Sequence, residues 1–323
     1  MTCTDRLSPV HPKPVGEAVS HSGVGVSIVA YQPDAAALNR LLEAVIHEAA
    51  PVVLLDNGGA AAVISPGLRE RIVILDPGRN LGVAAGHNQA LIALFKQGAA
   101  YALLFDQDSL PQPGMIHRLL GAEQALLAAG YRVAAVGPAH YATDGEKPAG
   151  FVRFSGCRPS VVLQADDEAP GDVCRCDFLI TSGTLLRKDV FEQVGAFDEA
   201  LFIDNVDIEW CYRAASRGLD CYGVPGARMQ HALGDHTRRV PMVRRPLVVH
   251  SPQRIYFMTR NRWLLYWMPH IPINWKLADV PRMGFKLLAF TLFVPPRLRY
   301  LRAGLAGLWD ALRRKGGAAR KIY

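Results

Sequence analysis

Two carboxylates follow one apolar segment in the first half of the chain. Asp106 and Asp108, separated by Gln107, come directly after residues 101–105, and a proline-rich turn follows. In an extended backbone, side chains two positions apart point to the same side, so both carboxylates can meet one ligand. Oxygen ligands of this kind suit a hard divalent cation, Mg²⁺ or Mn²⁺, which can neutralise a diphosphate. A strand that ends in a solvated turn would give the same pattern.

A second acidic group stands at the start of a segment with helical spacing, residues 206–215. It contains Asp204, Asp207 and Glu209. Carboxylates stabilise the first turn of a helix, which would be a purely structural role. A carboxylate can also take the proton of an attacking hydroxyl, which accelerates such reactions ~10²–10⁴-fold. Because helix positions two apart differ by ~200° in direction, Asp207 and Glu209 cannot point equally at one site.

The elements that would position these residues alternate along the chain. The expected strands cover residues 24–31, 51–55, 71–75, 101–105, 133–136 and 178–186, and the expected helices cover residues 34–49, 82–95 and 115–129. Residues 140–175 are less regular, which predicts a loop or a short hairpin. Continuous apolar strands alternating with helices predict an α/β fold with a mostly parallel central sheet flanked by helices. Ligands of such sheets bind at the carboxyl ends of strands, where Asp56, Asp106 and Asp108 stand. Neither a G-x-G-x-x-G loop nor a Walker A loop follows the first strand.

The order of several segments resembles that of family 2 glycosyltransferases of the GT-A fold. The matching segments are VSIVAY, LLDNGG, NLGVAAGHNQAL, LLFDQDS, GAFDEALFIDNVDIEWCYRA and HALG, within residues 24–235, roughly two thirds of the chain. Each segment alone is common, but the ordered set is specific. The FDQDS and FIDNVDIEWCYRA forms resemble the bacterial rhamnosyltransferase branch. The resemblance implies a nucleotide-diphospho-sugar transferase fold with a C-terminal basic helical extension.

The resemblance also implies roles for individual residues. It implies that Asp207 is the general base and that Glu209 holds the loop or the acceptor. It implies that Asp106, Asp108 and His231 bind Mg²⁺ or Mn²⁺, and an imidazole ligand favours Mn²⁺. The residues expected to bind the donor nucleotide are Tyr31, Asp56, Asn80, Gly82, Asn88 and Asp106, and those expected on the acceptor side are Ser182, Gly183 and Trp210.

Several of these residues have structural alternatives. Asp56 can accept the N3–H of a uracil or thymine, yet an aspartate before Asn-Gly is also a common turn residue. Residues 80–88 form a loop that enters a helix whatever their function. His231 fits a core histidine, and Trp210 fits core packing.

The implied reaction is the transfer of L-rhamnose from dTDP-L-rhamnose, with inversion, to a hydroxyl of a cell-surface glycan or glycolipid precursor, as in polysaccharide or lipopolysaccharide biosynthesis. The alternative within the family is a UDP-sugar donor, with hexosyl or galactofuranosyl transfer. A nucleotidyltransferase would need a glycine-rich, lysine-containing loop near the first strand, and the chain has none. A nucleic-acid-binding protein would explain a basic C-terminal region, but no recognition module is found, so nucleic acid is not an expected partner.

Charge divides the chain. Residues 1–227 hold 17 Lys/Arg against 26 Asp/Glu, a net −9, whereas residues 228–323 hold 19 against 3, a net +16. We expect a flexible arm over residues 1–22, a catalytic domain over 23–240 and a basic, amphipathic helical region over 241–323. That region could bind an anionic membrane surface through its Lys/Arg and its apolar residues. Packing on the catalytic domain, or on a second subunit of a homodimer, is the alternative.

The sequence carries few signs of export. The N-terminal residues lack the apolar segment of a signal peptide, and no run reaches the ~18–20 apolar residues of a membrane span. The six cysteines contain no C-x-x-C pair and imply no disulfide framework. These features predict a cytoplasmic protein, with peripheral attachment to the cytoplasmic face of the inner membrane as a further expectation.

Overall fold

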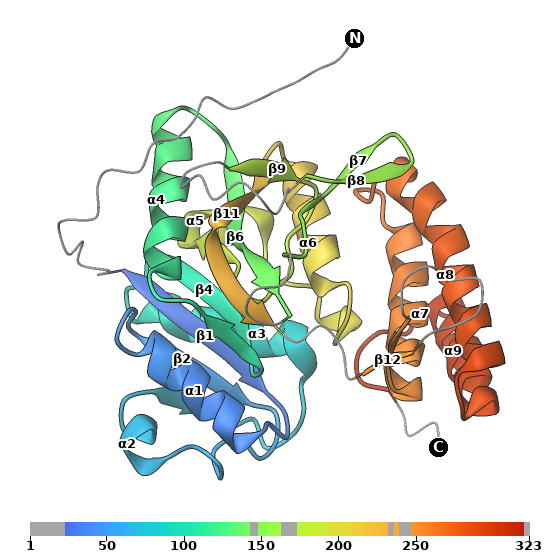
Figure 1. Ribbon diagram of the computed structural model, residues 1–323, viewed down its shortest axis with the longest axis horizontal. Helices are drawn as coiled ribbons and strands as arrows, with labels where there is room; N and C mark the ends of the chain where they lie inside the picture. Colours follow the sequence, from blue (N-terminus) through green and yellow to red (C-terminus); the bar gives the residue numbers. More distant parts are fainter. Residues whose placement is uncertain (1–22, 143–147, 163–172, 232–235, 239–246, 320–323) are drawn as a thin grey trace.

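The computed structural model describes residues 23–142, 148–162, 173–231, 236–238 and 247–319 (Figure 1). The predicted arm over residues 1–22 lies outside the described residues. A nine-stranded sheet forms the centre of the described part, and three helices from the end of the chain stand along one side of it.

The first half of the chain builds the parallel part of the sheet. Its strands are β1 (Val24–Ala30), β2 (Val52–Asp56), β3 (Val73–Leu75) and β4 (Tyr101–Asp106), and its helices are α1 (Ala35–Val45), α2 (Pro66–Arg69), α3 (Gly82–Lys96) and α4 (Met115–Ala128). Neighbours in the order β3-β2-β1-β4 are all parallel. Every residue of β1 and β2 is buried, because α1 and α4 pack on one face and α3 packs on the other. The predicted alternation of strands and helices is confirmed.

The second half extends the sheet with strands of both directions. These strands are β5 (Ser109–Pro111), β6 (Val133–Tyr141), β9 (Cys174–Cys176), β10 (Leu185–Arg187) and β11 (Asp220–His231). The order continues β4-β10-β6-β11-β5, with β9 also paired to β11. β10, β5 and β9 run antiparallel to their neighbours, whereas β6 and β11 are parallel. Helix α5 (Lys188–Val194), the 3₁₀ turn η1 (Glu199–Leu201) and helix α6 (Val206–Ala215) pack on the same face as α3.

The segment between β6 and β10 differs from the sequence-based prediction in one respect. Of the two alternatives expected within residues 140–175, a loop or a short hairpin, the structure contains the hairpin, formed by β7 (Val152–Ser155) and β8 (Arg158–Val161). The expectation that residues 178–186 form one strand was wrong, because β10 begins only at residue 185. Gly183 has a φ of +83°, which an extended strand cannot accommodate, so its neighbours form a turn instead.

The C-terminal elements share their core with the rest of the protein. They are β12 (His236–Arg238), β13 (Leu247–Val249), α7 (Pro252–Trp267), α8 (Ile273–Phe293) and α9 (Arg297–Leu312). Leu265 and Trp275 belong to the same apolar cluster as Tyr212 of α6, and the ring of Phe257 stacks on that of Phe202 at 5.1 Å between centroids. The core therefore continues past residue 240, where the sequence suggested a boundary. Among the helices described, none combines the length and the apolar composition needed to cross a bilayer.

Candidate active site

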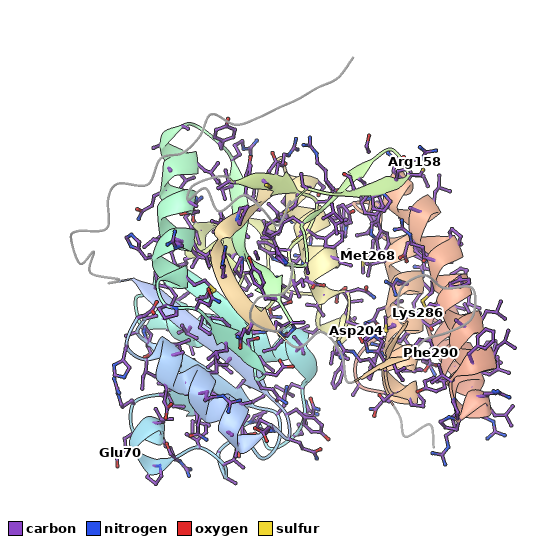
Figure 2. All side chains as sticks on the ribbon, in the orientation of Figure 1. Glu70, Arg158, Asp204, Met268, Lys286 and Phe290 are labelled. Atoms are coloured by element: carbon purple, nitrogen blue, oxygen red, sulfur yellow. The ribbon has the colours of Figure 1, made fainter. Side chains whose placement is uncertain are left out.

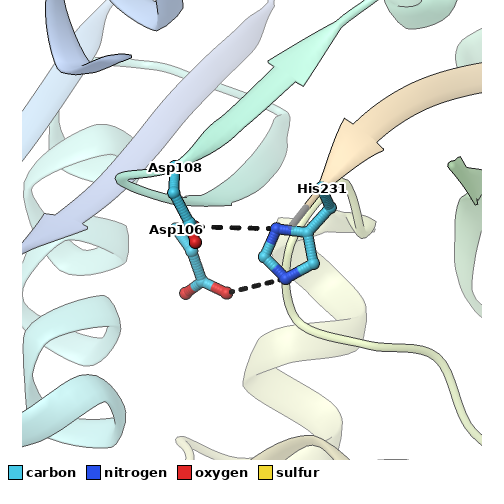
Figure 3. A group of neighbouring side chains, drawn as sticks. All are labelled: Asp106, Asp108 and His231. Atoms are coloured by element: carbon cyan, nitrogen blue, oxygen red, sulfur yellow. Dashed lines mark ion pairs between the residues drawn. The ribbon is translucent and has the colours of Figure 1, made fainter. Parts of the chain in front are cut away.

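Two aspartates and one histidine meet where β4 and β11 end (Figure 3). Asp106 is the last residue of β4, Asp108 lies in the turn before β5, and His231, at the end of β11, pairs with Ser109 of β5. Atom Nε2 of His231 is 4.0 Å from Oδ2 of Asp106, and Nδ1 is 3.6 Å from Oδ1 of Asp108. One ligand atom from each of the three residues lies within 4.8 Å of the other two. The pairing of β5 with β11 thus brings His231 next to two aspartates that lie more than a hundred positions earlier in the chain.

The electrostatics of this cluster suit a cation. Burial raises the pKa of Asp106; the neighbouring His231 lowers it, and the carboxylate of Asp108 raises it. Asp108 is the more open of the two aspartates, with its side chain 48% exposed. Two carboxylates and an imidazole form a donor set that fits Mg²⁺ or Mn²⁺, and a divalent charge would favour the ionised form of both carboxylates.

The turn at Ser182 and Gly183 supports the aspartate pair from the interior. The hydroxyl of Ser182 accepts the backbone N–H of Asp106 at 3.0 Å and lies 2.5 Å from the hydroxyl of Ser109. His140 donates from Nε2 to the carbonyl oxygen of Ser182 at 2.9 Å. Ser182 has no exposed surface. Since an acceptor cannot reach a side chain without exposed surface, the position of Ser182 fits a supporting role and not the expected acceptor contact.

Asp56, at the end of β2, shapes the loop that follows it. Its Oδ1 accepts the backbone N–H groups of Gly58 and Ala60 at 2.8 and 2.9 Å, and its Oδ2 accepts that of Ala61 at 2.8 Å. The residue is 5% exposed. Asp56 therefore stabilises the turn after β2, the structural alternative named from the sequence. Its Oδ2 atom still has one lone pair with which it could accept a hydrogen bond from a nucleotide base.

Three further residues predicted to bind the donor stand around the same edge. Tyr31 follows β1 with its ring half-exposed, and its backbone N–H donates to Oε1 of Gln107 at 2.6 Å. Asn80 accepts the backbone N–H of Gly82 at 2.8 Å. Gly82 has a φ of +84°, and a Cβ there would lie 2.5 Å from the carbonyl oxygen of Phe202. The glycine thus permits a close contact between the start of α3 and the loop that precedes α6.

Two predicted site residues lie in the interior. Asn88 is 2% exposed, and its amide donates to the carbonyl of Phe197 and accepts the backbone N–H of the same residue, both at 2.9 Å. Trp210 is also 2% exposed and donates from Nε1 to the carbonyl of Gly195 at 2.9 Å. Neither side chain has surface left for a donor or an acceptor. Both instead hold the segment that leads into α6.

Asp207, in the first turn of α6, has a raised pKa. Burial raises its pKa to about 6, and the charges of Asp204 and Asp106 raise it as well, while the backbone N–H of Ile208 donates to Oδ1 at 2.8 Å and partly offsets them. The charge of Asp106, at the end of β4, is thus close enough to raise the pKa of Asp207. A carboxyl group whose pKa lies close to neutral can accept a proton at physiological pH and transfer it afterwards.

Glu209 is directed elsewhere. Its carboxylate accepts two hydrogen bonds from Arg213, both at 2.9 Å, and pairs with Nε2 of His270 at 2.9 Å. Burial opposes ionisation, but the bonds from His270 and Arg213 outweigh it and hold the pKa of Glu209 below its usual range. This carboxylate connects α6 to the α7–α8 turn, which is a structural role.

The loop before α6 adopts an unusual backbone conformation. Phe202, Asp204 and Asn205 have φ angles of +63°, +65° and +62°. Side chains other than glycine seldom adopt such angles, which cost of order 1–3 kcal/mol each when the surroundings enforce them. Contacts from elsewhere must therefore hold this loop.

Helix α7 supplies those contacts. Arg254 pairs with the carboxylate of Asp204 at 3.2 Å, and Figure 2 marks Asp204 on the side of the sheet domain nearest the C-terminal helices. Arg260 and Asn261 are 1% and 0% exposed. The amide of Asn261 contacts the carbonyl oxygens of Leu201, Ile203 and Asp204 at 2.8, 2.6 and 2.8 Å, and Arg260 contacts those of Ala200 and Leu201 at 3.1 and 3.0 Å. We call these five carbonyl contacts the α7 clamp.

Sequence reasoning missed the α7 clamp. Asn261 of the clamp and Arg254, which pairs with Asp204 of the same loop, are seven positions apart, so they share one face of a helix. That spacing is equally typical of a solvent-exposed polar face, and only the packing of α7 on the loop distinguishes the two.

Removing the α7 clamp should slow the reaction. Asn261→Ala is expected to lower kcat about 10–100-fold, because a shift of ~1 Å in a reacting group can cost about 10²-fold. Thr259→Val is the matched control, since the buried Thr259 hydroxyl donates to the carbonyl of Ile255 within α7 and, in the part of the chain that the structure describes, to no residue of the loop before α6. Steady-state rates, with melting temperatures to confirm folding, measure the effect. Equal kcat for both variants would contradict the assignment.

Comparison with known proteins agrees with this geometry. The chain is 29% identical over 310 residues to a protein described as dTDP-rhamnosyl transferase RfbF of Shigella flexneri, covering 93% of this chain and 99% of that protein. Among solved structures, GalNAc-T7 with UDP, GalNAc and Mn²⁺ superposes with a TM-score of 0.52 at 14% identity, covering 84% of this chain and 58% of that one. TarS of S. aureus superposes with a TM-score of 0.50 at 14% identity, covering 87% of this chain and 47% of that one.

The two structural likenesses concern the fold alone, and they agree with the expected GT-A architecture. The family model described as "Glycosyltransferase like family 2" matches residues 21–263. This range includes the whole central sheet, the cluster of Asp106, Asp108 and His231, Asp207 and the α7 clamp. The chain belongs to glycosyltransferase family 2, and it is a glycosyltransferase with the GT-A fold.

Proposed function

We propose that the protein transfers L-rhamnose from dTDP-L-rhamnose to a hydroxyl group of a glycan or lipid-linked glycan, with inversion at the anomeric carbon. One observation carries the choice of donor: the similarity to dTDP-rhamnosyl transferase RfbF extends over 93% of this chain and 99% of that protein.

In this proposal Asp207 removes the proton from the acceptor hydroxyl. The oxygen then attacks the anomeric carbon from the face opposite the departing diphosphate, so the configuration inverts in one displacement without a covalent enzyme intermediate. Support comes from the pKa of about 6 at Asp207, which the charge of Asp106 helps to raise, and from the bonds that Arg213 and His270 make to Glu209. A carboxylate with this pKa is mostly ionised at neutral pH and can accept the proton of the hydroxyl.

The donor would lie along the ends of β1, β2 and β4. Asp106, Asp108 and His231 would hold a divalent ion, whose charge would stabilise the leaving diphosphate. Tyr31, with its half-exposed ring, would lie against the nucleotide base, and Asp56 would accept the N3–H of thymine. Asn80 and Gly82 would shape the loop beside the diphosphate, and Ser182, Gly183, Asn88 and Trp210 would support the site without touching substrate.

The test is nucleotide release from a panel of sugar nucleotides in the presence of Mg²⁺, Mn²⁺ or EDTA. We expect slow, metal-dependent release of dTDP from dTDP-L-rhamnose, because water can replace the acceptor, and no comparable release from UDP-galactose or UDP-N-acetylglucosamine. Isothermal titration of each donor in parallel separates weak binding from weak chemistry.

The alternative is a UDP-sugar donor within the same family. Metal-dependent release of UDP, with dTDP-rhamnose inert and unbound, would discard the rhamnose assignment and keep the reaction class. Binding of no sugar nucleotide at all would overturn the proposed function as a whole.

A further inference from the structure

The outward side of α8 is apolar along its entire length. Ile273, Leu277, Val280, Leu288 and Leu292 recur at helical spacing on this side, and each is between 47% and 63% exposed. Phe285 stands beside them and is 54% exposed. A surface helix normally turns one apolar stripe to the core. α8 already does so with other residues, among them Trp275 and Phe290, so its exposed apolar residues form a second apolar side. Contiguous exposed apolar surface of this kind marks an interaction site.

The charged residues of α8 all contact other parts of the protein. Asp279 pairs with Arg262 at 2.8 Å, and Lys276 donates to the carbonyl of Met268 at 2.8 Å. Lys286 lies against the sulfur of Met258 at 3.7 Å, and the guanidinium of Arg282 lies over the ring of Phe154. No charged side chain of α8 therefore lies on the outward apolar side, and that side presents few groups that can form hydrogen bonds with water.

The neighbouring helix α9 adds basic residues to this surface. Its exposed apolar residues are Leu298, Leu305, Trp309 and Leu312, between 54% and 67% exposed. Its exposed cations, with those directly after it, are Arg297, Arg299, Arg302, Arg313, Arg314 and Lys315. The guanidinium of Arg313 lies 4.1 Å from the ring centre of Trp309, and that of Arg314 lies 5.8 Å from that of Trp267. Its single carboxylate, Asp310, accepts the hydroxyl of Tyr256.

We propose that the outer side of α8 and α9 lies on an anionic phospholipid bilayer. The apolar residues would enter the level between headgroups and acyl chains, and the arginines would bind headgroup phosphates. Trp and Arg side by side suit this boundary, since each has an apolar body and a polar end. We refer to this surface as the α8–α9 face.

The charge of the α8–α9 face argues against a second copy as its occupant. In a two-fold symmetric dimer the same patch meets itself, so Arg302 and Arg313, which lie beside the apolar stripe of α9, would face the cations of the other copy. Anionic lipid neutralises them instead. The inference deepens the proposed function, because a lipid-linked acceptor would be presented beside α7, whose inner side holds the loop before Asp207.

The test is flotation of the full-length protein with vesicles. We expect binding to phosphatidylcholine vesicles that contain phosphatidylglycerol, little binding to pure phosphatidylcholine, and weaker binding as salt rises toward 0.5 M, because salt screens the charges. Quenching of tryptophan fluorescence by brominated lipid should fall in Trp309→Phe. Trp210 and Trp275 are each 2% exposed, so they should contribute little to the quenching.

Two double variants separate the apolar and basic parts. Leu277→Asn with Leu288→Asn, and Arg302→Glu with Arg313→Glu, are each expected to lower the partition coefficient at least about tenfold. The matched controls are Ile92→Asn on α3, at a residue 48% exposed, and Arg40→Glu on the exposed surface of α1, both outside the C-terminal helices. Donor hydrolysis without vesicles should be unchanged in all four proteins, which shows that they fold.

The outcomes decide the inference independently of the proposed function. Vesicle binding that the α8–α9 variants retain, or its absence in the natural protein, would overturn the membrane proposal while donor hydrolysis still tests the enzyme. A dimer of the natural protein that becomes a monomer in the leucine variant, without vesicle binding in either, would assign the face to self-association and would equally overturn it.

Discussion

Asp207→Asn is expected to lower the rate of sugar transfer about 10²–10⁴-fold while donor binding stays intact, because it removes the base that accepts the hydroxyl proton. Asparagine keeps the shape of the side chain and can still accept the N–H of Ile208 through its oxygen. The measurement is single-turnover transfer, with calorimetric titration of the donor as the check on binding. Near-normal turnover in this variant would exclude Asp207 as the base.

Two features sharpen this prediction. Since the base acts in its ionised form and its pKa lies at about 6, kcat/KM should fall about tenfold per unit as pH drops below 6 and should level off above it. The raised pKa also means that ionisation of Asp207 destabilises the fold above pH 6, by up to about 3 kcal/mol for a shift from 3.8 to about 6. The asparagine variant should therefore melt at a higher temperature at pH 8, with little difference below pH 4.

Glu209→Gln is the matched control on the same helix. This substitution weakens the contacts with Arg213 and His270, so the melting temperature should fall. The rate per folded molecule should stay close to that of the natural protein. A loss of activity equal to that of Asp207→Asn, without loss of stability, would assign the base to Glu209 instead.

Removal of the divalent ion is the second change expected to have a large effect. Chelation by EDTA, or Asp108→Asn, is expected to reduce donor turnover about 10²–10³-fold, the size seen when one group that stabilises developing charge is lost. Asp108 is chosen because its side chain is the more exposed of the two aspartates, so its substitution should disturb packing least. Glu70→Gln is the control, an exposed carboxylate on the far side of the molecule (Figure 2).

Metal binding can be measured without turnover. Mn²⁺ at 100 times its dissociation constant should stabilise the natural protein by about 2.7 kcal/mol, seen as a rise in melting temperature. Asp108→Asn should lose this rise, and His231→Asn should weaken Mn²⁺ more than Mg²⁺, because imidazole favours the transition metal. Donor turnover that survives EDTA in all proteins would contradict a metal-dependent mechanism.

Much of the fold could be predicted from local pattern. The strands that end at Asp56 and Asp106 are five and six residues long, and every residue before the aspartate is apolar. Such runs between helical segments have few alternatives to a covered parallel sheet. The prediction of a strand at residues 178–186 was wrong because Gly183 adopts a φ of +83°, which breaks the extended backbone even though the segment is mostly apolar.

The sequence by itself determined which chemical groups the site contains and which family the chain resembles, because residue types and their order survive without coordinates. It also implied the partnership of Asp106, Asp108 and His231 and the choice of Asp207 over Glu209. Only the tertiary structure decided that Asn88, Trp210 and Ser182 lie inside, that α7 holds the loop before α6, and that α8 turns its apolar side outward. These features depend on contacts between residues far apart in the chain, and the periodicity of one segment does not reveal which of its faces another segment will cover.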